Sequence, residues 1–174
     1  MSIARFVMFI GVTIAAIVIT NHAPALAQDA APPPAADSGV IRVKSAYDMD
    51  ETLVRIKKDI AAKGLRFFDE IDQAQLAAGA GIKLQPSVLL MFGNPPLGIQ
   101  FLTANPYAGL DWPVRMLVFQ DATGQVWIAY SDFAYIANRH HITGRPAQFK
   151  MAAEVAASIA SSAQFNPMSP PQKP

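Results

Sequence analysis

The 174-residue sequence contains no cysteine. This absence excludes disulfide scaffolds, thiol nucleophiles, thiolate metal sites and lipid attachment through an N-terminal cysteine. Charge is also scarce, because charged residues make up 16% of the chain and 14 Lys and Arg residues stand against 13 Asp and Glu residues. Since phosphate binding needs a basic surplus, a net charge of +1 argues against nucleic acid as the main partner.

Signatures of well-known enzyme classes are missing as well. The sequence has no GxSxG nucleophile elbow, P-loop, HExxH zinc motif or EF-hand loop, and Gly79-Ala80-Gly81 lacks the third glycine of a dinucleotide site. The two histidines after residue 27, His140 and His141, are adjacent. Neighbouring side chains diverge on a helix or a strand, so this pair is poorly placed to bind one metal ion together.

Residues 1–27 have the pattern of a secretory signal peptide. Arg5 is their single charge, an uncharged run extends from Phe6 to Thr20, and Pro24-Ala25-Leu26-Ala27 forms a small-residue cleavage site. An uncleaved anchor is the alternative, but the run falls short of the roughly 20 residues that cross a membrane as a helix. We therefore predict cleavage after Ala27, a periplasmic or secreted protein, and no membrane contact once the leader is removed.

The remaining chain is predicted to hold one domain between two proline-rich ends. Residues 28–39 contain Pro32 to Pro34 and no large side chain, so they form an extended linker. Residues 166–174 contain four prolines and are predicted to be a disordered tail. Between them, residues 40–165 show no internal repeat and no second domain boundary.

Periodicity predicts an α+β fold with two layers, in which helices pack on a mostly antiparallel sheet of four to five strands. A capping box at Asp48 and a stripe of Met49, Leu53, Ile56 and Ile60 predict the first helix, which Gly64 ends. The continuous apolar run 88–92 predicts a central strand, covered on both faces or on one face and by a dimer contact. The predicted strands span 40–44, 65–71, 88–92, 114–119 and 126–130, the last two forming a hairpin, and further helices span about 72–79, 96–104, 132–140 and 147–163.

Four motifs in this order resemble the family called domain of unknown function 302. They are Phe92-Gly93-Asn94-Pro95, Gly109-Leu110-Asp111-Trp112-Pro113, Asp121 to Gly124, and Arg139-His140, and the resemblance runs from Val43 to about Ile142. It implies a small α+β domain that is often dimeric, and no established reaction. Members often carry histidine after an Ile-Asp pair, whereas Gln73 follows Ile71-Asp72 here.

Six residues are the candidate ligand contacts: Asn94, Pro95, Asp111, Trp112, Arg139 and His140. The amide of Asn94 can donate and accept hydrogen bonds at the end of a strand, or it can cap its own turn. Asp111 can act as an acid or base if Trp112 buries it, or it can pair with Arg115 or Arg139. His140 can bond a loop near a helix end, or it can ligate a metal.

Three hypotheses follow from these candidates. The leading one is a non-catalytic module that binds a small molecule or a protein, in a homodimer built on the hairpin or the central sheet, with no cofactor. A metal- or haem-linked redox accessory protein using His140 is the first alternative. An acid/base enzyme using Asp111 and His140 is the second.

Overall fold

The structure is a computed structural model that describes residue 34 and residues 37–164. The predicted leader (1–27), most of the predicted linker (28–39) and the predicted tail (166–174) lie outside the described residues, so these three assignments stay predictions.

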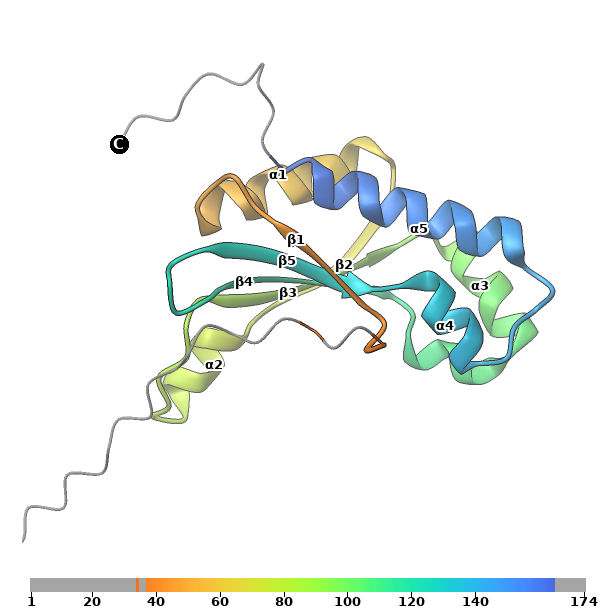
Figure 1. The fold of residues 1–174 in the computed structure, drawn as a ribbon, viewed down its shortest axis with the longest axis horizontal. Helices are drawn as coiled ribbons and strands as arrows, with labels where there is room; N and C mark the ends of the chain where they lie inside the picture. The colour runs from red at the N-terminus through yellow and green to blue at the C-terminus, as the bar shows by residue number, and fades with distance from the viewer. Residues whose placement is uncertain (1–33, 35–36, 165–174) are drawn as a thin grey trace, which may run out of the picture.

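Alternating apolar residues build a five-stranded antiparallel sheet with the strand order β1-β5-β4-β3-β2 (Figure 1). The predicted hairpin is confirmed, because β4 and β5 pair from Met116 opposite Tyr130 to Gln120 opposite Val126. In the turn between them, Gly124 adopts a positive φ of 85° that glycine tolerates. The strands are β1 (Val40–Lys44), β2 (Arg66–Asp72), β3 (Ser87–Gly93), β4 (Val114–Gln120) and β5 (Val126–Ser131).

The apolar run 88–92 forms an interior strand of the sheet, as predicted. β3 lies between β4 and the edge strand β2 and pairs with both. Val88, Leu90 and Phe92 are buried, whereas Leu89 and Met91 are half-buried, because successive side chains of a strand point to opposite faces. Helices therefore cover β3 on one face. The predicted dimer contact on the other face stays a prediction.

The first helix forms for the reasons that the sequence supplies. The Asp48 side chain accepts a hydrogen bond from the Glu51 backbone N–H at 2.9 Å and caps α1 (Met49–Ala62). Leu53, Ile56 and Ile60 on the apolar stripe of α1 are buried against the sheet. The apolar face of α1 and the facing side of the sheet pack together and form the main core.

The helices complete a two-layer α+β fold, as predicted. In Figure 1, α1 and α5 (Pro146–Ser161) lie across one face of the sheet. The helices α3 (Pro95–Ala104) and α4 (Phe133–Arg139) gather with the 3₁₀ helix η1 (Pro106–Leu110) at one end of the sheet, and α2 (Gln73–Gly79) lies at the opposite end (Figure 1). Within residues 34 and 37–164, no helix is both long and apolar enough to cross a membrane.

Candidate functional site

The turn Gly93-Asn94-Pro95 joins β3 to α3, and its asparagine side chain caps the start of the helix. The Asn94 Oδ1 atom accepts a hydrogen bond from the Leu97 backbone N–H at 3.2 Å, while the Asn94 carbonyl accepts one from the Gly98 N–H at 2.8 Å. Pro95 then occupies the first turn of α3, where its missing N–H costs nothing. The Asn94 amide is thus a helix cap whose NH₂ group is left at the exposed end of β3.

The indole ring of Trp112 packs against this turn and against α3. A Cβ atom built on Gly98 would lie 2.0 Å from Trp112 Nε1, and one built on Gly93 would lie 3.2 Å from the same atom. On another side, Phe68 meets the Trp112 ring edge to face, with ring centroids 5.6 Å apart. Gly98 is therefore needed for the position of this indole, and a side chain at Gly93 would press on it.

An apolar cavity of about 80 Å³ opens beside Trp112. Its walls come from three strand-end or turn segments and from the helices α3, α4 and α5, and their surface is almost entirely apolar. Met151, 54% exposed, lies at its outer side. The lining residues are Leu65, Phe92, Gly93, Asn94, Leu97, Gly98, Phe101, Trp112, Val114, Phe133, Met151, Ala152, Val155 and Ala156.

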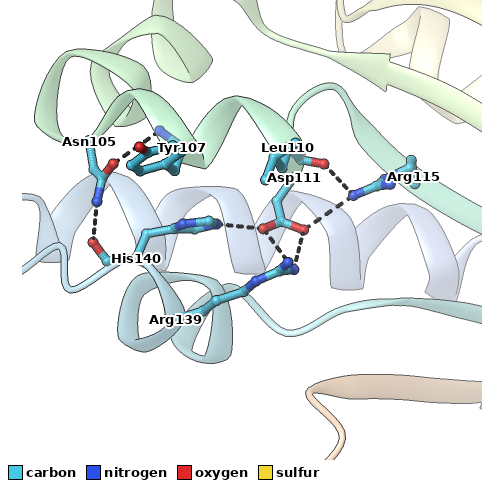
Figure 2. Close-up of polar contacts among 7 residues, drawn as sticks. All are labelled: Asn105, Tyr107, Leu110, Asp111, Arg115, Arg139 and His140. Atoms are coloured by element: carbon cyan, nitrogen blue, oxygen red, sulfur yellow. Dashed lines mark hydrogen bonds and ion pairs between the residues drawn. The ribbon is translucent and has the colours of Figure 1, made fainter.

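Asp111, directly before Trp112, is the centre of a charged cluster (Figure 2). Its Oδ2 lies 2.6 Å from His140 Nε2, and Arg139 Nη1 donates to both carboxylate oxygens at 3.2 Å. Arg115 Nη2 donates to Asp111 Oδ1 at 3.2 Å and to the Leu110 carbonyl at 2.5 Å. We call Asp111, Arg115, Arg139 and His140 the Asp111 cluster.

The Asp111 cluster has two buried side chains at its centre and two exposed side chains at its edge. The side chains of Asp111 and His140 are 6% and 5% exposed, whereas those of Arg115 and Arg139 are 45% and 48% exposed. The His140 carbonyl also accepts a hydrogen bond from Asn105 Nδ2 at 2.8 Å (Figure 2). The cluster therefore ties the end of η1 to β4 and to the end of α4.

This geometry favours a structural role for the Asp111 cluster over acid/base chemistry. A general base must reach a substrate proton, but His140 directs Nε2 at a carboxylate in a buried position, and neither His140 nor Asp111 lines the cavity. No group of three or more His, Cys, Asp or Glu side chains in the described part of the chain is arranged to hold a metal ion. In the fold, Gln73 and His140 lie on α2 and after α4, at opposite ends of the sheet (Figure 1).

The structure thus sorts five of the six predicted residues into two groups. Asp111, Arg139 and His140 come together in the Asp111 cluster, and Asn94 and Trp112 line the cavity. Pro95 begins α3 and is not a lining residue. Sequence reasoning missed the cavity walls on α3 and α5, where Gly98 inside an apolar helix was the one available signal of a close approach.

A second buried carboxylate fixes the β4–β5 turn. Asp121 Oδ1 accepts hydrogen bonds from the Thr123 hydroxyl at 2.6 Å and backbone N–H at 2.9 Å, and Oδ2 accepts one from Trp127 Nε1 at 2.7 Å. The hydrogen bonds from the Thr123 hydroxyl and the Trp127 indole lower the pKa of Asp121 to about 2. Asp121 is therefore the turn's fixed negative charge.

Comparison with known proteins bears on the resemblance noted above. The family model described as domain of unknown function DUF302 matches residues 41–164. The chain belongs to the DUF302 family. A crystal structure of an uncharacterized conserved DUF302 protein from Bacillus stearothermophilus is similar with a TM-score of 0.67 and 16% identity, covering 72% of this chain and 98% of that one. At this identity the likeness shows the DUF302 fold.

Two further relatives are named as fluoride channels. Fluoride-specific ion channel FluC 1 of Brucella suis biovar 1 and of Brucella abortus biovar 1 are each 35% identical to this DUF302 chain over 106 residues, which is 61% of the chain. The chain spans 42% and 39% of the length of these relatives. The similarity therefore concerns a part of each channel chain.

Proposed function

We propose that this DUF302 domain is a non-catalytic binding module that works outside the cytoplasm and holds a compact apolar group in the cavity beside Trp112. The observation that carries the proposal is the lining, in which Asn94 alone among the lining side chains has hydrogen-bonding amide groups and the other walls are aliphatic or aromatic. Ligand sites are typically concave and apolar, with few polar groups that fix orientation. The group it binds belongs to a small molecule or to a side chain of a partner protein.

The size of the cavity limits what it holds. An apolar cavity of roughly 150 Å³ accepts a benzene ring, so a space of about 80 Å³ suits a short alkyl group better than a whole cofactor. A ligand that fills the space contacts its apolar walls, which provides a driving force for binding.

The mouth of the cavity has the features of an entrance. Met151 is unbranched, exposed and flexible, so it can move aside for a ligand. The Asn94 NH₂ group, at the exposed end of β3, can donate a hydrogen bond to a polar head outside the cavity. These two residues favour a ligand with an apolar end and a polar, uncharged end.

The relatives named as fluoride channels add one element to the proposal. A sequence similar to part of this chain occurs within those longer proteins, which supports a DUF302 module that can be joined to a membrane protein. An apolar side chain of a membrane partner is therefore one occupant that we consider. The homodimer expected from the sequence stays a prediction, and the experiment below also measures it.

Native mass spectrometry of the exported protein, purified without chelator, tests the proposal. We expect a co-purifying mass, or saturable binding of added 1-hexanol, which has an alkyl end and an uncharged polar end. Val155→Phe places a larger side chain in the cavity wall and should abolish this binding. Val54→Phe, at a 56% exposed position on α1 away from the cavity, is the matched control and should retain it.

Equal binding by the Val155 and Val54 variants, or no bound mass and no saturable uptake in the unaltered protein, contradicts the proposal. The same spectra report metal and oligomeric state. A stoichiometric metal lost in His140→Ala would instead support the redox accessory hypothesis.

A further inference from the structure

The sheet has a second apolar face, on the side that α1 and α5 do not cover. Cross-strand register places Leu89 opposite Leu117, and Phe119 opposite Trp127, with all four side chains half-buried and on the face opposite the core residues Leu90, Val118 and Ile128. We call Leu89, Leu117, Phe119 and Trp127 the open face. Contiguous apolar patches of this kind mark interaction sites in soluble proteins.

The linker before β1 is attached at a point from which it can fold back over the open face. The Gly39 carbonyl accepts a hydrogen bond from the Asp132 N–H at 2.7 Å, and its φ of +67° belongs to the left-handed region. A Cβ atom on Gly39 would lie 2.2 Å from the ring of Tyr135, so α4 holds this residue closely. The left-handed residue redirects the chain at the beginning of β1.

The linker is long enough to reach Trp127. Pro34 is five residues before Gly39, and these residues would span at most about 16 Å in an extended proline helix. Their span is shorter here because Asp37 and Ser38 form a turn and a bend, and Pro32 and Pro33 add further length. Trp127 pairs with Lys44, four residues after Val40 in β1, which is about 13 Å along the strand. A linker that runs back beneath β1 therefore brings its prolines level with Trp127 and Phe119.

The chemistry of the two surfaces also matches. Pro34 is half-buried, whereas a proline in a fully solvated spacer is exposed. Proline-rich segments dock on grooves lined by aromatic side chains. The face also carries Arg42, whose guanidinium lies 3.5 Å from the centroid of the Trp127 ring, and Lys44 two residues on. Residues 28–39 contain Asp29 and Asp37 and no basic residue, so the charge of the linker is opposite to that of Arg42 and Lys44.

From these observations we infer that the linker segment Pro32–Pro34 docks on the open face and covers Phe119 and Trp127. Because the segment is tethered, its effective concentration is in the millimolar range and a weak contact is sufficient. The docked segment competes with any external partner for the open face, including a second copy of the chain. This surface is distinct from the cavity, so the inference does not depend on the proposed function.

A spin label tests the inference directly, because the chain has no native cysteine and contains two tryptophans. We would label the exported protein with a nitroxide at Ala31→Cys and record the two indole N–H signals. The Trp127 signal should lose more than half its intensity, and the Trp112 signal, from the other side of the sheet, should keep most of it. A label at Ser169→Cys in the C-terminal segment is the control and should leave Trp127 unchanged.

Three outcomes would overturn the inference. Equal intensities of the Trp127 signal with labels at positions 31 and 169 would show that the linker does not dock. Broadening that appears when spin-labelled protein is mixed with isotope-labelled, spin-free protein would show that a second copy covers the open face. Replacing Pro32, Pro33 and Pro34 with glycine should restore the Trp127 signal in the protein labelled at position 31, and persistent broadening would show that the prolines do not hold the segment.

Discussion

Trp112 and Gly98 are in such close contact that position 98 has no room for a side chain, since a Cβ atom there would fall 2.0 Å from the indole Nε1. Gly98 lies inside α3, where alanine is normally favoured over glycine by about 1 kcal/mol. Close approach, not helix propensity, therefore explains glycine at this position. The contact holds Trp112 in the wall of the cavity.

Gly98→Ala should destabilise the protein. Despite the better helix propensity of alanine, displacement of Trp112 should lower the free energy of unfolding by about 1–3 kcal/mol and shift tryptophan emission to longer wavelength. Urea unfolding followed by fluorescence measures both effects. Gly79→Ala in α2, where a Cβ atom meets nothing within 4 Å, is the control and should be neutral or slightly stabilising. Indistinguishable variants would show that the Trp112 contact is unimportant.

Asp111→Asn should reveal the structural role of the Asp111 cluster. The substitution weakens the charged hydrogen bonds to Arg115, Arg139 and His140, and we expect a loss of about 2–3 kcal/mol in the free energy of unfolding. Asp59→Asn, which removes a more exposed pair with Lys63, should cost less than about 1 kcal/mol. Equal losses of unfolding free energy in the two variants would argue against a structural role for the Asp111 cluster.

The acid/base hypothesis makes a different prediction for the same Asp111 variant. If Asp111 and His140 were catalytic, a broad screen for hydrolase and isomerase activity would find turnover that Asp111→Asn removes. Because His140 is buried and does not line the cavity, we expect no such turnover. Any activity lost in the Asp111 variant but retained in the Asp59 variant would revive the enzyme hypothesis.

Asp121 should give the folded state a defined sensitivity to acid. Its pKa is lowered from 3.8 to about 2, so its hydrogen bonds stabilise the folded state above about pH 4, and this contribution is lost as the pH falls from 4 towards 2. The difference in unfolding free energy between the unaltered protein and Asp121→Asn should therefore shrink across that window. Urea titrations at several pH values measure it, with Asp50→Asn as a control for loss of an exposed charge. A difference that stays constant would contradict the assignment.

The predicted leader is tested by the mass of the exported protein. Cleavage after Ala27 gives a chain that begins with Gln28, and Ala27→Tyr should block cleavage at this bond because the site requires a small residue. Ala36→Tyr, outside the site, should be processed normally. Full-length protein retained in the membrane fraction would instead indicate the uncleaved anchor.

Much of the fold could be predicted because its signals are local. The alternation in 114–119 and 126–130, the turn at Asp121 and the cap at Asp48 each depend on residues a few positions apart. The apolar run 88–92 correctly predicted an interior strand, but such a run does not specify which strands are its neighbours. Strand order depends on how the connections pack, and that information is spread along the chain.

The site could be predicted only in part. The pairing of Asp111 with an arginine followed from its neighbours, but its contact with His140, 29 residues away, requires the folded arrangement of η1 and α4. The cavity was missed because Phe101, Val155 and the other wall residues have the same periodicity as ordinary core residues. A cavity is a property of how these surfaces fit together, which composition and spacing do not reveal.

Binding in the cavity is tested most directly by nuclear magnetic resonance of the exported protein during a titration with 1-hexanol. We predict saturable shifts of the Leu97, Val114 and Val155 methyl signals and of the Trp112 indole N–H, with no shift of the Trp127 indole or of the exposed Leu76 methyls. Shifts confined to exposed residues, or linear changes without saturation at the cavity residues, would contradict the account.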